Sequence, residues 1–360
     1  MLLRRRIGAF IALAVVALAG ACGPPPTTAT PTARPSATDA TQGLAAAVAT
    51  LARGFDGKSG IFIAFPGAAQ PIYASGADTS FVAASLYKLG VLLRVESLVD
   101  SGAVSYDDTI TIEDADVTVD GSNEYPGTVL TIDQALEEMV TYSDNGAALA
   151  LLRVYGAHAA NAALAASGIA GFHVAESDGQ DHVVTARALG TFFDLLATRR
   201  LLSSAASERM LARLERQTIN DRLPRDLPDD VAVAHKTGDL VGLVHDAGLI
   251  GTPSGPRIAV VLTSGGTEAD AKDLIARIGA DVYSAVLPRP AGADAAPLPA
   301  TQTIWARLGT ITAVLLPIAA ILILALAALA AARRTMPRRI RRASGPMTVW
   351  SPDRTRGRTR

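Results

Sequence analysis

A run of 25 residues without a charge, Leu308–Ala332, lies near the C-terminal end of this 360-residue chain. A helix of that length crosses the hydrocarbon core of a bilayer, and the indole of Trp305 suits the membrane interface. We therefore expect a transmembrane helix over 304–332. Six of the ten residues that follow are arginines. Because basic flanks stay in the cytoplasm, the tail 333–360 is predicted to be cytoplasmic and the part before the helix extracytoplasmic.

The first 22 residues predict a signal peptide, with a basic start at Met1–Arg6, an apolar stretch at Ile7–Ala21 and then Cys22. The apolar stretch is short for a membrane span. The residues up to Cys22 resemble a lipoprotein signal, although Ala19 stands where a larger aliphatic residue is usual. Three outcomes stay open, namely lipidation of Cys22, simple cleavage and an uncleaved anchor.

Two stretches, 23–43 and 287–303, are rich in Pro and Ala and predict linkers that bury no core. Between them, 44–286 is long enough for one sizeable core or two associated lobes. Once the thirteen basic residues at the two ends and Asp353 are set aside, 20 basic and 33 acidic residues remain, a net charge of −13. An acidic domain of this kind argues against nucleic acid as a partner.

Cysteine and histidine give no support for a metal centre. The single cysteine, Cys22, can form neither an internal disulfide nor a zinc cluster. The five histidines show no paired ligand spacing such as HExxH. We therefore expect no metal centre.

The order of helical and strand-like patterns in 44–286 is helix, strands, several helices, strands and helix. Strand patterns cover 59–65, 71–74, 231–235, 245–250 and 258–263, and helical patterns cover 43–55, 85–98, 132–139, 145–154, 186–196, 207–216 and 267–286. Strands from both ends would meet in one antiparallel sheet, with the central helices as an inserted lobe. The expected fold class is thus α/β of the α+β kind, with a groove between the lobes as the place for a site.

The first motif with chemical content is Ser85-Leu86-Tyr87-Lys88, an S-x-x-K. Positions three apart share one face of a helix, so the Lys88 amine can reach the Ser85 hydroxyl. A serine needs a nearby base to act as a nucleophile, and a desolvated lysine with a lowered pKa can be that base. Alone, the motif is weak because S-x-x-K arises often by chance.

The second motif, Ser143-Asp144-Asn145, follows 58 residues after Ser85. The Ser143 hydroxyl could pass a proton between Lys88 and a leaving nitrogen, and the Asn145 amide could hold Lys88 and a substrate carbonyl. Asp144 is expected to accept backbone hydrogen bonds and so to fix the loop. Taken alone, this triplet is equally typical of an Asx-turn or a helix cap.

The third motif is Lys236-Thr237-Gly238, at the end of a strand. A lysine and a hydroxyl here can bind a substrate carboxylate, and Gly238 leaves room for substrate at the strand edge. The backbone N–H groups of Asp239 and Ser85 would form an oxyanion hole. Alone, K-T-G is also common in surface turns.

Together, the three motifs occur in the order known for penicillin-recognising serine hydrolases, and the chain resembles a class A β-lactamase over about 44–286. The resemblance extends to FVAASLYK, LTIDQALEEMVTYSDNGAA and HKTGDLVGLVHDAGLI. It implies that Ser85 attacks the carbonyl of a β-lactam or of a D-alanyl peptide of peptidoglycan. It further implies that Lys88 and Ser143 move protons, and that Asn145, Lys236 and Thr237 position the substrate. No cofactor is implied by the resemblance.

The chain departs from the family in the loop that normally carries a deacylating glutamate in E-x-x-x-N. Here the loop, 171–185, is about half a dozen residues short and has Glu176 but no E-x-x-x-N. We name Glu176 as a candidate base, with Asp178 or Asp181 as substitutes and a solvated loop acid as the simpler interpretation. Asp239 is a second departure, since its negative side chain could weaken the binding of anionic substrates. His235 and His245 flank the same turn and are expected to serve packing and hydrogen bonding.

Three functions fit these residues. The first is a β-lactam-hydrolysing serine enzyme held at the membrane. The second is a D-alanyl-D-alanine peptidase or esterase with slow deacylation, which the short loop favours. The third is a non-catalytic surface domain that binds muropeptides, against which the intact set of Ser85, Lys88, Ser143 and Lys236 argues.

Overall fold

The computed structural model of this protein describes residues 37–117, 121–177 and 179–285. Within these ranges no helix is both long and apolar enough to cross a membrane. The expected signal peptide with Cys22, the linker 287–303, the membrane helix 304–332 and the tail 333–360 lie outside the described residues.

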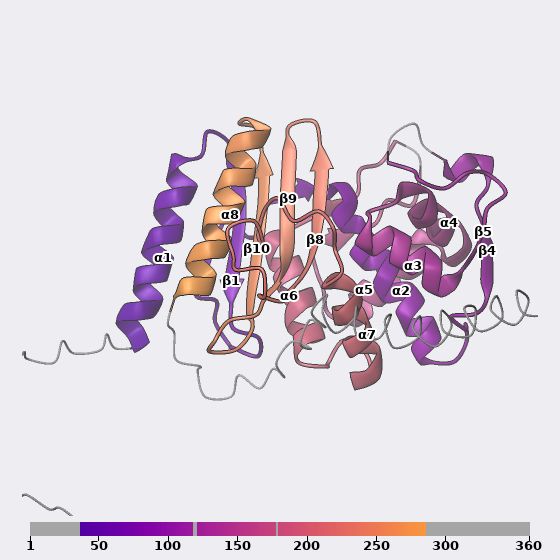
Figure 1. The fold of residues 1–360 in the computed structure, drawn as a ribbon, viewed down its shortest axis with the longest axis horizontal. Coiled ribbons are helices and arrows are strands. Elements are labelled where there is room, and N and C mark those ends of the chain that lie inside the picture. The colour runs from indigo at the N-terminus through magenta and orange to yellow at the C-terminus, as the bar shows by residue number, and fades with distance from the viewer. Residues whose placement is uncertain (1–36, 118–120, 178, 286–360) are drawn as a thin grey trace, which may run out of the picture.

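A five-stranded antiparallel sheet forms the centre of one half of the molecule (Figure 1). Its strands lie in the order β2 (Tyr73–Ser75), β1 (Lys58–Ala64), β10 (Arg257–Ser264), β9 (Leu243–Ile250) and β8 (Val233–Leu240). Strand β1 pairs with β10, with Ile61 opposite Val261, so the expected meeting of strands from both ends of the domain is confirmed. Strand β8 is the edge strand that faces the helical half (Figure 1).

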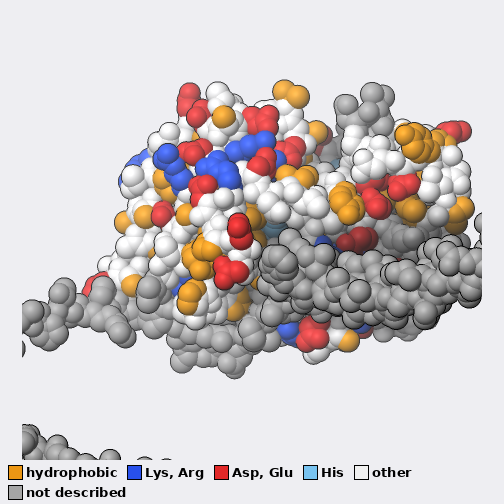
Figure 2. All heavy atoms as spheres, in the orientation of Figure 1, with side chains coloured by type: hydrophobic (Ala, Val, Ile, Leu, Met, Phe, Trp, Pro, Cys, Tyr) orange, Lys and Arg blue, Asp and Glu red, His pale blue; other side chains and the backbone are white. Residues whose placement is uncertain are grey.

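Helices cover both faces of the sheet. Helices α1 (Ala37–Gly54) and α8 (Glu268–Ser284) pack together on one face, and α6 (Ala186–Ala197) covers the other (Figure 1). The Thr267 side chain accepts a hydrogen bond from the Asp270 N–H and caps α8. Over the face that α8 covers, basic and acidic side chains intermingle (Figure 2).

The second half of the molecule is the inserted helical lobe. It contains the 3₁₀ turn η1 (Ala84–Tyr87), α2 (Lys88–Asp100), β4 (Thr109–Thr111), η2 (Asp114–Asp116), β5 (Val129–Thr131), α3 (Ile132–Thr141), α4 (Asn145–Tyr155), α5 (Ala157–Ala166) and α7 (Ser204–Leu214). A small sheet of β3 (Phe81–Val82), β7 (Val183–Val184) and β6 (Phe172–His173) lies beside it. Helix α2 is buried along most of its length, from Lys88 to Glu96, which makes it the centre of the lobe.

The structure differs from the sequence-based expectation in its shorter elements. The two-residue strands are too short to show a period, and the alanine-rich α5 lacks a contrast between apolar and polar faces. Helix α1 begins at Ala37 and not at Gly43, and Asp39 in its first turn suits the positive end of the helix dipole. The end of the stretch 23–43 expected as linker is therefore helical.

Candidate active site

Ser85 lies on a tight turn between the small sheet and the central helix of the lobe. Strand β3 leads into η1, where Ala84 has a φ of +47°, a conformation that costs a non-glycine residue energy. Ser85 follows in the same turn, half-buried, and α2 begins at Lys88. The expected single helix over 85–98 is thus a 3₁₀ turn joined to an α-helix.

The Lys88 side chain is fully buried and is held by the loop of the second motif. Its Nζ donates to the Ser143 carbonyl oxygen at 2.5 Å and to Asn145 Oδ1 at 2.7 Å, and lies 3.3 Å from Ser143 Oγ. Within the described residues no hydrogen bond joins Lys88 Nζ to the Ser85 hydroxyl. Burial lowers the pKa of Lys88 to about 7, against a smaller opposing effect of the Asp144 carboxylate. Lys88 can therefore be a neutral amine near neutral pH.

The Ser143 loop owes its shape to Asp144. Asp144 caps α4 by accepting a hydrogen bond from the Ala147 N–H, and its other oxygen accepts one from the Asn123 N–H. This confirms the expected role of Asp144 in fixing the loop. Ser143 itself has a φ of +60°, which directs both its carbonyl and its hydroxyl toward the lysines.

Lys236 reaches the same hydroxyl from the other half of the molecule. Its Nζ donates to Ser143 Oγ at 2.8 Å and to the Thr237 carbonyl oxygen at 3.0 Å. Burial, and next the positive charge of Lys88, lower the pKa of Lys236 well below its ordinary value. The Ser143 hydroxyl thus lies between two buried amines, one from each lobe.

Gly238 is needed for a reason that the sequence did not indicate. A Cβ at this position would lie 3.0 Å from the Ala83 carbonyl oxygen and 3.3 Å from the Ala84 Cβ. The missing side chain therefore lets β8 approach the Ser85 turn itself, whereas we expected it to leave room for substrate. This close approach brings β8 against η1, while the oxyanion hole of the Ser85 and Asp239 N–H groups stays a prediction.

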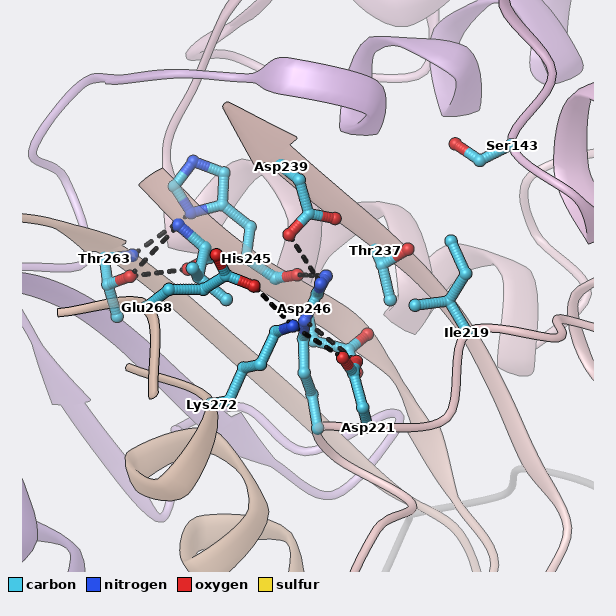
Figure 3. A network of polar contacts seen from close by, with 12 residues as sticks. Ser143, Ile219, Asp221, Thr237, Asp239, His245, Asp246, Thr263, Glu268 and Lys272 are labelled. Carbon is cyan, nitrogen blue, oxygen red and sulfur yellow. Dashed lines mark hydrogen bonds and ion pairs between the residues drawn. The ribbon is translucent and has the colours of Figure 1, made fainter. Parts of the chain in front are cut away.

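Two features of β8 and its neighbours were missed by the sequence interpretation. The Asp239 carboxylate is bound by Arg222, with an Oδ1–Nη2 distance of 2.5 Å. The Thr237 hydroxyl is buried and has no hydrogen-bond partner among the described residues. Figure 3 shows Thr237 and Asp239 on one strand, between Ser143 and the side chains of Asp221 and Lys272. Arg222 belongs to no motif, so only the folded loop reveals it.

Glu176, the candidate base in the short loop, forms its side-chain contacts with Asn161 and His158. Asn161 Nδ2 donates to Glu176 Oε1 at 2.8 Å, and His158 Nδ1 lies 3.3 Å from Oε2. The Asn161 hydrogen bond is the main cause that lowers the pKa of Glu176. A base that activates water near neutral pH needs a raised pKa, so these contacts do not favour that role. Asp181 is exposed, and Asp178 lies outside the described residues.

His182, from the same loop, lies against the nucleophile turn instead. Its ring stacks on Tyr87 with centroids 3.9 Å apart, and its carbonyl oxygen accepts from the Ala83 N–H at 2.7 Å. Nδ1 accepts a hydrogen bond from the Ala175 N–H, which places the proton of the neutral ring on Nε2. Burial lowers the pKa of His182 to about 4. No local pattern in the sequence marks this histidine.

The two histidines beside the third motif serve structure, as expected. His235 is buried and contacts Asp246 through Nδ1 at 2.9 Å and Asn220 through Nε2 at 3.0 Å. His245 Nε2 donates to the Val82 carbonyl oxygen, which ties β9 to the strand before Ser85. Among the described residues no group of three His, Cys, Asp or Glu side chains is placed to hold a metal ion.

Comparison with known proteins agrees with this geometry. Residues 43–286 match the model of the β-lactamase enzyme family. The chain is 28% identical to β-lactamase VEB-1 of Pseudomonas aeruginosa over 207 residues, which are 51% of this chain and 69% of that protein.

Two solved structures share the fold. A β-lactamase from Sphaerobacter thermophilus superposes with a TM-score of 0.63 at 26% identity, over 69% of this chain and 98% of that one. PBP-A superposes with a TM-score of 0.62 at 24% identity, over 69% of this chain and 96% of that one. The chain thus belongs to the β-lactamase enzyme family and is a serine hydrolase of the β-lactamase-like type.

Proposed function

We propose that this hydrolase opens β-lactam rings through an acyl intermediate on Ser85. The observation that carries the proposal is the Ser143 hydroxyl between Lys88 and Lys236, both buried, directly beside the Ser85 turn. Such a relay is what acyl transfer to a serine and protonation of a leaving nitrogen require.

The reaction follows from these positions. Neutral Lys88 accepts the proton of the Ser85 hydroxyl while Ser85 Oγ forms a bond to the lactam carbonyl carbon. The backbone N–H groups of Ser85 and Asp239 stabilise the oxyanion. When the carbon–nitrogen bond breaks, Lys88 returns the proton through Ser143 to the ring nitrogen. Water then adds to the acyl carbon and releases Ser85, leaving a carboxylic acid.

Substrate positioning falls to the residues around this relay. Asn145, which holds Lys88, can also present its amide to a substrate carbonyl. Lys236 and Thr237 lie on the facing strand, and Gly238 holds that strand close. No cofactor takes part in this scheme.

We also propose that the catalytic domain works outside the cell, attached to the membrane. The support is the sequence alone, that is, the signal-like 1–22 with a candidate lipidation site at Cys22, the apolar run in 304–332 and the basic tail 333–360. Peptidoglycan and β-lactams both occur on that side of the membrane.

A second function, a D-alanyl-D-alanine peptidase or esterase with slow deacylation, is favoured by one observation. The carboxylate of Glu176 is engaged by Asn161 and His158, so its assignment as the deacylation base remains a prediction without supporting contacts. Acylation by Ser85 would then proceed normally and the acyl-enzyme would persist.

The test uses the full chain in detergent with a chromogenic cephalosporin, followed by absorbance and by intact mass. We expect sustained turnover, with Ser85→Ala losing both turnover and adduct. One equivalent of product with a stable adduct on Ser85 would favour the peptidase instead. Neither turnover nor adduct, with ligand binding retained in Ser85→Ala, would leave the non-catalytic surface domain as the function.

A further inference from the structure

Asp239 places a carboxylate at the substrate end of β8. It follows the Lys236-Thr237-Gly238 motif directly and its side chain is 45% exposed. Residues two apart on a strand share a face, so Asp239 lies on the same face of β8 as Thr237. The Thr237 hydroxyl is buried and without a hydrogen-bond partner among the described residues, as a group reserved for a ligand would be.

The cation nearest to Asp239 is already engaged by the protein. The Arg222 side chain is 2% exposed. Nη2 binds Asp239, Nη1 donates to the His245 carbonyl oxygen at 3.1 Å, and Nε lies 3.3 Å from Asp221. Two carboxylates, those of Asp221 and Asp239, balance the single positive charge of Arg222, so the attraction of this group for an anionic ligand is weak.

The cavity beside Asp239 also has no excess of positive side chains among its lining residues. A cavity of about 530 Å³ opens there, lined by Asp221, Asp239 and Glu268 and by Arg222 and Lys272. Lys272 is bound by Asp221 at 2.8 Å and by Glu268. Three carboxylates thus face two cations, and both cations are paired within the protein (Figure 3).

We infer that Asp239, held by Arg222, is a specificity-determining residue that favours acyl donors with a neutral or cationic group next to the scissile bond over otherwise equal donors with a carboxylate there. The inference rests on the proposed function of the same site. A substrate group that accepts the Thr237 hydrogen bond comes next to the Asp239 carboxylate. A negative charge there is repelled by Asp239, whereas an amide or an ammonium group is not.

The test is a pair of chromogenic cephalosporins that differ only in a free carboxylate or a primary carboxamide on the ring. For the full chain we expect a higher kcat/KM with the carboxamide. Asp239→Asn, which keeps size and backbone, should raise the carboxylate-to-carboxamide ratio of kcat/KM about tenfold or more, since like charges in contact are costly. Adding Arg222→Gln to Asp239→Asn should reduce that gain only in part, because the repulsion by Asp239 stays removed and only the attraction of the freed guanidinium is lost.

The matched control is Glu268→Gln, which removes an equal charge from the same cavity without contact to Arg222. Its carboxylate-to-carboxamide ratio should match that of the parent chain. An unchanged ratio in Asp239→Asn, or an equal change in Glu268→Gln, would overturn the inference.

A binding measurement separates this inference from the proposed function. The same two compounds are titrated by calorimetry into Ser85→Ala and into Ser85→Ala with Asp239→Asn, where no turnover is needed. A carboxylate that gains affinity only when Asp239 is neutralised supports the inference even if the parent chain does not hydrolyse the ring. Equal affinities in the two variants would refute it even if hydrolysis is fast.

Discussion

Lys236 Nζ lies 2.8 Å from the Ser143 hydroxyl, although 93 residues separate the two in the chain. Lys236 comes from the edge strand of the sheet and Ser143 from a loop of the helical lobe. The contact therefore joins the two halves of the molecule at the candidate active site. Disturbing either partner should change the chemistry more than the fold.

Replacing Ser143 tests the relay. Ser143→Ala should slow acylation about 10²- to 10⁴-fold, because the proton path to the leaving nitrogen is lost. Stopped-flow absorbance and intact mass measure this rate. Ser143→Gly should slow acylation equally but be about 1 kcal/mol more stable than Ser143→Ala, because glycine adopts a φ of +60° without steric cost. Equal melting temperatures for the two variants would contradict the strain at this position.

The pKa of Lys88 predicts how acylation depends on pH. Because burial lowers this pKa to about 7, the neutral amine gains population as pH rises through that value. The acylation rate constant should therefore rise with pH, with a midpoint near 7, and then level off. Lys88→Met should abolish both the rate and its pH dependence. An acylation rate that stays flat from about pH 6 to about pH 8, which is about one pH unit on either side of the midpoint, would require a base other than Lys88.

Gly238→Ala tests the close approach of β8 to the Ser85 turn. The added methyl group would lie 3.0 Å from the Ala83 carbonyl oxygen, so strand or turn must shift. We expect the free energy of unfolding to fall by roughly 1–3 kcal/mol and acylation to slow as the oxyanion donors separate. The control is Gly43→Ala, because Gly43 lies inside α1 with no atom within 4 Å of the added group. That change should leave stability equal or raise it by up to about 1 kcal/mol.

Glu176→Gln tests the base of deacylation. Since Asn161 and His158 hold the carboxylate, we expect the lifetime of the acyl-enzyme to change less than about threefold, far below the 10²-fold that loss of a general base causes. Intact mass after a single exposure to penicillin measures the lifetime. Asp181→Asn is the matched loop-acid control. An adduct that persists only in Glu176→Gln would establish Glu176 as the base and require the loop to rearrange on acylation.

The sequence predicted the candidate site residues better than it predicted the short elements of the fold. Ser85, Lys88, Ser143 and Lys236 were named as candidates because each belongs to a short motif whose spacing carries chemistry, and the structure places the Ser143 hydroxyl between the two lysines. The main sheet and most of the long helices, such as α8, were found because their apolar periodicity is clear. The ten-residue α5 was missed because it lacks a contrast between apolar and polar faces. The two-residue strands β3, β6 and β7 were missed because so few residues show no period.

What the sequence determined by itself is thus the family, the candidate residues of the site and the order of the main elements, since motifs and periodicity are local properties of the chain. Only the tertiary structure decided which residues surround that chemistry. The Arg222 pair with Asp239, the stack of His182 on Tyr87 and the contact that requires Gly238 all join segments far apart in the sequence. Such contacts depend on how β8 and the helical lobe pack against each other, and a local sequence pattern does not predict which distant residues will meet.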